Sequence, residues 1–150
     1  MKPVALLSLV MLFTPLLSQA SLGGVESSVQ QDQVDFHDSK TNFYRHPTYH
    51  IHEITHDRLA IREFVTLDGK VFAVAWKGPA HPDLSAILGA HFQDYKTAME
   101  QSRGQRRGRA PVSAHSNGLR IEVGGHIRSI YGRVWIPNLL PGGFDLSEIQ

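Results

Sequence analysis

Three stretches near the middle of the chain show the spacing of apolar and polar residues that is typical of β-strands. They cover Tyr49–His56, Leu59–Thr66 and Val71–Lys77. The third stretch is apolar at successive positions, so we expect it to be buried on both faces, as a central strand is. Asp68-Gly69 is a strong signal for a two-residue hairpin turn, and Asp57-Arg58 is a weaker one. The pattern predicts an antiparallel meander of three strands.

Helical periodicity follows this meander. Pro82-Asp83 suits a first helical turn, because proline is tolerated there and aspartate favours the positive end of the helix dipole. The positions that then recur every three or four residues are Leu84, Ile87, Leu88, His91, Phe92, Tyr95 and Met99. They predict one long helix whose apolar stripe packs on the sheet. Weaker spacing predicts a short helix over Val25–His37, and we interpret Asp38–Pro47 and Gln101–Ala110 as loops.

The last third of the chain predicts a hairpin and a tail. Leu119–Val123 and His126–Ile136 resemble two strands joined at Gly124-Gly125. The tail over Leu139–Gln150 has three apolar anchors, which are Leu139, Leu140 and Phe144. The whole pattern predicts an α+β domain. Its antiparallel sheet has about five strands, formed by the meander and the C-terminal hairpin, and the long helix covers one face.

The first residues indicate export. Lys2 precedes an almost wholly apolar run over Val4–Leu17, and Ser18-Gln19-Ala20 offers the small residues of a cleavage site. We therefore expect residues 1–20 to be a signal peptide and residues 21–150 to form one domain, released to the periplasm or the exterior without stable membrane insertion. The alternative is an uncleaved N-terminal anchor. The absence of cysteine excludes a lipid-modified N-terminal cysteine and disulfides.

The charge balance argues against nucleic acid as a partner. The chain has 15 Lys and Arg and 14 Asp and Glu, and removal of Lys2 with the signal makes the two sets equal. A neutral domain has no overall field that would attract a polyanion. Four arginines fall within Gln101–Ala110, but no aromatic residues are interleaved with them, so we interpret this segment as a solvated loop.

Several segments resemble a known family. The most specific runs are Arg62-Glu63-Phe64-Val65 and Gly69–Pro79, and further matching runs are Tyr49–Glu53, Pro82-Asp83-Leu84, Ile87-Leu88-Gly89, Gly124–Arg128, Gly132-Arg133 and Leu139-Leu140-Pro141. These residues are similar to the domain of unknown function 2844 family, which consists of small exported bacterial proteins. The resemblance implies export and a single domain, and it implies no activity or catalytic residue.

The expected register of the meander brings charged and ionisable residues together. The two turns would place His52 opposite Glu63 and Glu53 opposite Arg62, on opposite faces of the sheet. The face with His52 and Glu63 would also carry Ile54, Ile61, Val65, Phe72, Val74 and Trp76. Two readings stay open for His52 and Glu63, a buried structural pair or an acid/base or ligand-orienting pair. We expect Glu53 and Arg62 to form a cross-strand ion pair.

Two further groups of residues are candidates for ligand binding. His50 and His52 share one strand face, and His126 would complete a zinc or copper site if it approached them. His126, Arg128 and Arg133 lie near one another in the second hairpin and could hold a carboxylate or phosphate, or could protect a solvated strand edge. A two-residue turn at Gly124-Gly125 would place Ile121 opposite Arg128, whereas a glycine bulge would move His126 and Arg128 to the other face.

The functional prediction is a non-catalytic binding or assembly module that presents a sheet face or edge to an exported or envelope protein. The sequence contains no nucleophile elbow, phosphate loop or helical metalloprotease motif. The alternative is a small metal- or anion-binding protein, or an enzyme, that uses His52, Glu63 and His126 with Arg62, Arg128 and Arg133 as further ligand residues.

Overall fold

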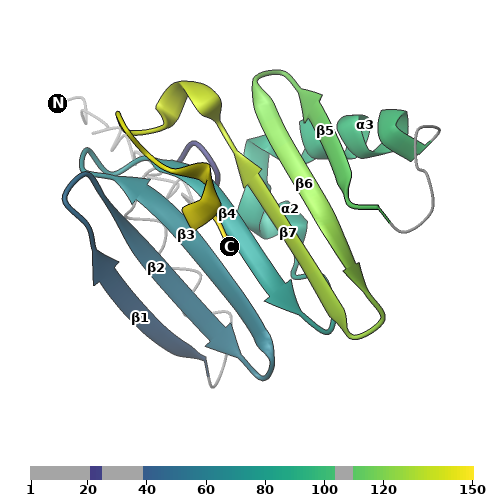
Figure 1. Cartoon of the computed structure of the whole chain (residues 1–150), viewed down its shortest axis with the longest axis horizontal. Helices are drawn as coiled ribbons and strands as arrows, with labels where there is room; N and C mark the ends of the chain where they lie inside the picture. Colours follow the sequence, from purple (N-terminus) through teal and green to yellow (C-terminus); the bar gives the residue numbers. More distant parts are fainter. Residues whose placement is uncertain (1–20, 25–38, 104–109) are drawn as a thin grey trace, which may run out of the picture.

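A computed structural model describes residues 21–24, 39–103 and 110–150. Seven antiparallel strands form one sheet in the order β1-β2-β3-β4-β7-β6-β5 (Figure 1). In chain order they are β1 (Lys40–Arg45), β2 (Tyr49–His56), β3 (Leu59–Thr66), β4 (Val71–Gly78), β5 (Val112–Ser116), β6 (Leu119–His126) and β7 (Ser129–Trp135). The α+β class and the antiparallel sheet are confirmed. β4 lies at the centre, as its apolar sequence predicts.

The sheet has two strands more than we expected. β1 lies within the stretch interpreted as a loop, and β5 precedes the C-terminal hairpin. All six residues of β1 are exposed, so no buried face imposes the apolar alternation by which a strand is recognised. β1 is a strand because it pairs with β2. The expected helix over residues 25–37 and the arginines within 104–109 lie outside the described residues.

The long helix is confirmed, and it is interrupted by one tighter turn. It comprises α2 (Leu84–Leu88), the 3-10 turn η2 (Gly89–His91) and α3 (Phe92–Ser102). Asp83 is its N-cap, because its carboxylate accepts hydrogen bonds from the main-chain N–H groups of Ser85 and Ala86. No helix within the described ranges is long and apolar enough to cross a membrane.

The two faces of the sheet are covered differently (Figure 1). The helices lie behind β7, β6 and β5, and they enclose a core built around Trp76, Leu88 and Ile121. The C-terminal tail crosses the opposite face of the sheet. The tail contains two 3-10 turns, η4 (Pro137–Leu139) and η5 (Leu146–Glu148). On this face there is a second core, and the expected anchors of the tail, Leu139, Leu140 and Phe144, pack there together with Ile149. The tail is therefore a third layer of the domain.

The predicted register of the meander is confirmed, with one correction. His52 pairs with Glu63, Glu53 with Arg62, and Glu63 with Val74. A register shift between Phe64 and Val65 then leaves Phe72 as an extra residue on β4, just after the turn. Because a bulge of this kind changes which face a residue occupies, Phe72 packs on the tail side and not on the helix side.

The bulge accompanies a longer turn than the expected two-residue one. Gly69 N–H donates to the Thr66 carbonyl, and Thr66 N–H donates to the Lys70 carbonyl, so Leu67, Asp68 and Gly69 form the loop. Gly69 has φ of 82°, the conformation that a glycine bulge of this hairpin type requires.

The turn of the C-terminal hairpin is not at Gly124-Gly125. β6 continues to His126, which pairs with Ser129, so the turn residues are Ile127 and Arg128. Ile121 faces Val134, and neither alternative register of the glycine pair is adopted. Gly124 lies within the strand, where a Cβ atom would overlap the ring of Tyr131. The two glycines therefore mark a close approach and not a reversal of the chain.

Candidate functional site

The residues predicted to bind ligands occupy three separate places on the sheet. His52 and Glu63 lie on the helix side of β2 and β3, and Arg62 and Arg133 lie under the tail on the other side. His126 and Arg128 lie at the tip of the β6–β7 hairpin. These residues do not form one site, so each place has to be considered by itself.

His52 and Glu63 are buried opposite each other. Only 9% of His52 and 1% of Glu63 are exposed. The His52 ring and the Phe43 ring of β1 meet edge to face, with a centroid distance of 4.8 Å. A buried pair held between three neighbouring strands is not open to a solute. Of the two readings, the arrangement favours the structural one.

Arg62 forms the expected ion pair with Glu53. Its Nε donates to Oε2 of Glu53 over 2.6 Å, and its Nη1 donates to the main-chain oxygen of Gln150 over 3.1 Å. Burial acts to raise the pKa of Glu53, but hydrogen bonds from Arg62, Asn42 and Tyr44 outweigh burial and lower that pKa. Glu53 is therefore held as a carboxylate that joins β1, β2 and β3.

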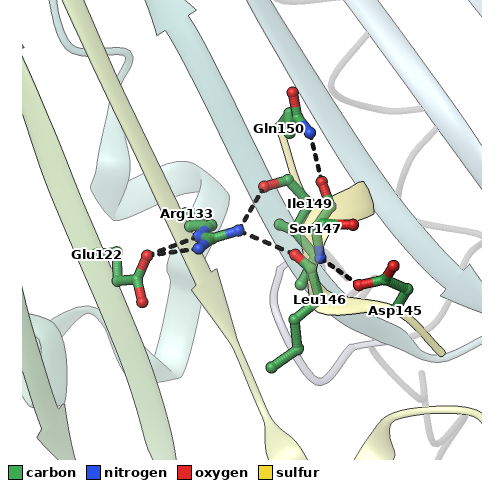
Figure 2. Close-up of polar contacts among 7 residues, drawn as sticks. All are labelled: Glu122, Arg133, Asp145, Leu146, Ser147, Ile149 and Gln150. Atoms are coloured by element: carbon green, nitrogen blue, oxygen red, sulfur yellow. Dashed lines mark hydrogen bonds and ion pairs between the residues drawn. The ribbon is translucent and has the colours of Figure 1, made fainter.

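Arg133 makes a matching set of contacts on the other side of β4 (Figure 2). Its Nε and Nη2 donate to Oε2 of Glu122 over 2.9 and 2.6 Å. Its Nη1 points toward the tail and donates to the carbonyls of Leu146 and Ile149 over 2.9 and 3.2 Å. Because these contacts occupy the donors of the guanidinium fork, Arg133 fastens the tail to the sheet in this structure.

Tyr49 provides a third polar anchor for the tail. Its hydroxyl donates to the carboxylate of Glu148. Burial, together with the hydrogen bond and the negative charge of Glu148, raises the pKa of Tyr49. Beside this bond Ile149 is 1% exposed. The bonds from Tyr49 and Arg62 to the tail join residues that are 99 and 88 positions apart, and no local pattern in the sequence signals them.

Small cavities lie on both sides of Gln150. One measures about 300 Å³ and is lined by residues that include Lys77, Tyr131 and Arg133. The other measures about 180 Å³ and is lined by residues that include Ala60, Arg62 and Lys77. Since Arg62 and Arg133 are already paired with glutamates, Lys77 is the cation at these cavities that is not engaged in an ion pair among the described residues.

The three histidines proposed for a metal site are brought together only in part. The rings of His50 and His52 are 6.4 Å apart by centroid. His126 lies on β6, four strands away from β2 in the sheet order, where its Nδ1 is 3.1 Å from the carbonyl oxygen of Ile127. Over the described ranges, no three His, Cys, Asp or Glu side chains are grouped as a metal ion requires.

The outer edge of the sheet is the feature that sequence reasoning missed. β1 is its last strand, and Phe43 and Tyr44 within it are each 44% exposed. Thr41 and the adjacent aromatic residues Phe43 and Tyr44 have high β-propensity, and this was the available signal. Large exposed aromatic residues on an edge with which no other described strand pairs are the usual composition of a recognition surface.

Comparison with protein families finds a match over residues 18–149 to the family described as protein of unknown function (DUF2844). A search of curated proteins and a search of solved structures found no match. The match covers nearly the whole chain and includes the meander, the helix, the C-terminal hairpin and the tail. The chain therefore belongs to this family of proteins of unknown function.

Proposed function

We propose that the protein is an exported, non-catalytic binding module that takes an extended, acidic segment of a partner protein as an additional strand beside β1. The observation that carries this proposal is the edge itself, a strand of six residues that are all exposed. Extended peptides bind such edges through main-chain hydrogen bonds, and side chains at alternate positions supply specificity. The apolar run and cleavage signal of residues 1–20 support export.

The main chain of β1 offers the hydrogen-bonding groups that strand addition needs. His46 N–H donates to the Tyr49 carbonyl over 2.9 Å, which makes His46 and Tyr49 a hydrogen-bonded pair. Such pairs alternate along an antiparallel ladder, so Arg45, Phe43 and Thr41 direct their main-chain groups away from β2. The outward N–H and C=O groups are thus concentrated at these three positions.

The charges of β1 favour an acidic partner over a second copy of this chain. Lys40 and Arg45 are exposed at the two ends of the strand. If two copies of β1 paired antiparallel about Phe43, Arg45 of each copy would lie opposite Thr41 and close to Lys40 of the other, so like charges would gather at both ends of the pair and destabilise it. A partner segment with aspartate or glutamate at both ends would place opposite charges at the same positions.

The non-catalytic character is supported by the positions of the acid and base candidates. His52 and Glu63 are buried, and the Arg62 and Arg133 guanidinium groups are bonded to glutamates and to the tail. A general acid or base needs access to the substrate proton that it transfers. Hydrolysis of a broad substrate panel that His52→Ala abolishes would contradict the proposal.

Strand addition is tested with two variants of one residue. Thr41→Pro removes an outward N–H without removing a hydrogen bond to β2, and Thr41→Val changes the side chain but keeps that N–H. The probe is a synthetic peptide of alternating threonine and valine with aspartate at both ends, and its lysine-ended counterpart is the control. We expect the wild type and Thr41→Val to bind the acidic peptide, and Thr41→Pro and the lysine-ended peptide to give little binding.

Two results would overturn this proposal. The first is equal binding of the acidic peptide by Thr41→Pro and the wild type, because the outward N–H would then have no role. The second is a dimer of the wild type that Thr41→Pro dissociates, since a second copy would then be the occupant of the edge. Circular dichroism of Thr41→Pro establishes that the sheet itself is retained.

A further inference from the structure

A small hollow at one end of the sheet is lined by three cations. It measures about 180 Å³, and its lining residues are Arg58, Lys77, Gly78, Pro79, Arg128 and Ser129. We call it the basic hollow. Arg58 comes from the β2–β3 turn, Lys77 from the end of β4 and Arg128 from the β6–β7 turn. Three segments that are distant in sequence therefore contribute one positive charge each to the same place.

The cations of the basic hollow differ from Arg62 and Arg133 in having no counter-charge among the described residues. Arg62 and Arg133 each pair with a glutamate at 2.6 Å. Neither Arg58, Lys77 nor Arg128 forms an ion pair with a described residue, and no acidic residue is among those that line the hollow. Asp57, the acidic residue of the β2–β3 turn, is 3.8 Å from His56. Like charges gathered without a counter-ion attract an anion from solution.

The tip of the β6–β7 hairpin carries Arg128 next to an exposed aliphatic residue. Arg128 has φ of 68°, which lies in the left-handed region that glycine adopts most readily. The preceding turn residue, Ile127, is 88% exposed. The tip of this hairpin therefore presents an aliphatic side chain beside the basic hollow.

We infer that the basic hollow binds a phosphate group, and that the phosphate belongs to the headgroup of an anionic lipid. Cations that approach one point from three separate segments suit a phosphate, whose oxygens are arranged tetrahedrally, better than a planar carboxylate. A volume of about 180 Å³ admits one such group with a short stem and is below the usual range for a drug-sized ligand. A free phosphate has the same chemistry, but exposed Ile127 beside the cations is typical of contact with a membrane surface.

Binding to vesicles and binding to a soluble anion are measured in parallel to distinguish the two sources of phosphate. The purified chain is sedimented with phosphatidylcholine vesicles, with and without phosphatidylglycerol. Inorganic phosphate is titrated separately by nuclear magnetic resonance. The variants are Arg58→Gln, Lys77→Gln, Arg128→Gln and Ile127→Ser. The wild type and all variants begin at the same residue. Arg120→Gln is the matched control, because Arg120 is an exposed arginine of β6 outside the hollow.

We expect the wild type to bind only the vesicles that contain phosphatidylglycerol. Each of the three cation variants should weaken that binding by about fivefold, and a variant that lacks all three cations by about a hundredfold. Ile127→Ser should weaken binding to vesicles without changing the phosphate titration. Arg120→Gln should behave as the wild type does.

Three results would overturn the inference, in whole or in part. Binding of neither vesicles nor phosphate would remove the site. An equal loss in Arg120→Gln and in the cation variants would show a general effect of charge without a site. Phosphate binding that depends on the three cations, without binding to vesicles, would assign the hollow to a soluble phosphate and overturn the lipid source.

Discussion

Arg62 and Arg133 lie on opposite sides of Ala75 in a single row across the sheet. Each pairs on its outer side with a glutamate of the next strand, Glu53 or Glu122, and each donates to a main-chain oxygen of the tail. Ala75 is 2% exposed, and its small side chain leaves room for the tail between the two guanidinium groups. The central row of the sheet is therefore a symmetrical fastening for the end of the chain.

Replacement of Arg133 by lysine tests this fastening. A lysine retains the charge but cannot reproduce the fork that engages Glu122 together with two tail carbonyls. Because both side chains of the ion pair are partly exposed, we expect Arg133→Lys to lower the free energy of unfolding by about 1–2 kcal/mol. Urea unfolding measures the loss, and faster trimming of the C-terminus by carboxypeptidase locates it. Arg120→Lys is the control, and stability and trimming unchanged in Arg133→Lys would contradict the role given to Arg133.

The pair of Glu53 and Arg62 should make stability depend on acid pH. Folding lowers the pKa of Glu53, so this carboxylate adds stability above its unfolded pKa of about 4.3 and loses it as the pH falls through the folded value. At neutral pH we expect Glu53→Gln to cost about 1 kcal/mol, because Arg62 is partly exposed. The difference between the two proteins should shrink steadily below about pH 4. Urea titrations from neutral to acid pH test this, with Glu100→Gln on α3 as a control, and a difference independent of pH would refute it.

Gly132 is predicted to be intolerant of any side chain. A Cβ atom there would overlap the ring of Trp76, which is 2% exposed and belongs to the helix-side core. We expect Gly132→Ala to destabilise the domain by about 1–3 kcal/mol, because the buried ring would have to shift. Gly142→Ala provides the comparison, since a Cβ atom there would meet nothing within 4 Å. Thermal unfolding of both variants decides the matter, and equal melting temperatures would show that the core adapts to the alanine.

The beginning of the helix depends on Asp83. Its carboxylate accepts hydrogen bonds from Ser85 N–H at 2.9 Å and Ala86 N–H at 3.3 Å. A hydrogen bond from the Ser85 hydroxyl, together with these two, lowers the pKa of Asp83. We expect Asp83→Ala to cost about 1 kcal/mol of stability and Asp83→Asn to cost much less, because asparagine caps helices well. Chemical denaturation distinguishes the two variants. If alanine and asparagine had the same effect, the side-chain cap would be unimportant.

Much of the central sheet could be predicted from the sequence. The bounds of β2 and β3, the pairing of His52 with Glu63, and the ion pair of Glu53 with Arg62 follow from strand periodicity and from the Asp57-Arg58 turn. Phe72 was placed on the wrong face because a bulge adds a residue without changing the apolar pattern. The hairpin turn was misplaced because glycine favours both tight turns and close packing, and here Gly124 serves the packing of Tyr131.

The sequence by itself determined the elements whose signals are local. These are the meander, the capped helix and the apolar anchors of the tail, because periodicity and turn chemistry act over a few residues. Only the tertiary structure decided what lies beside them. Arg62 meets Gln150, Tyr49 meets Glu148, and Arg58 meets Arg128 around the basic hollow. These contacts depend on the order of the strands and on the path of the tail, and no periodic pattern in the sequence signals them. They determine which edge, face and hollow remain available for a partner.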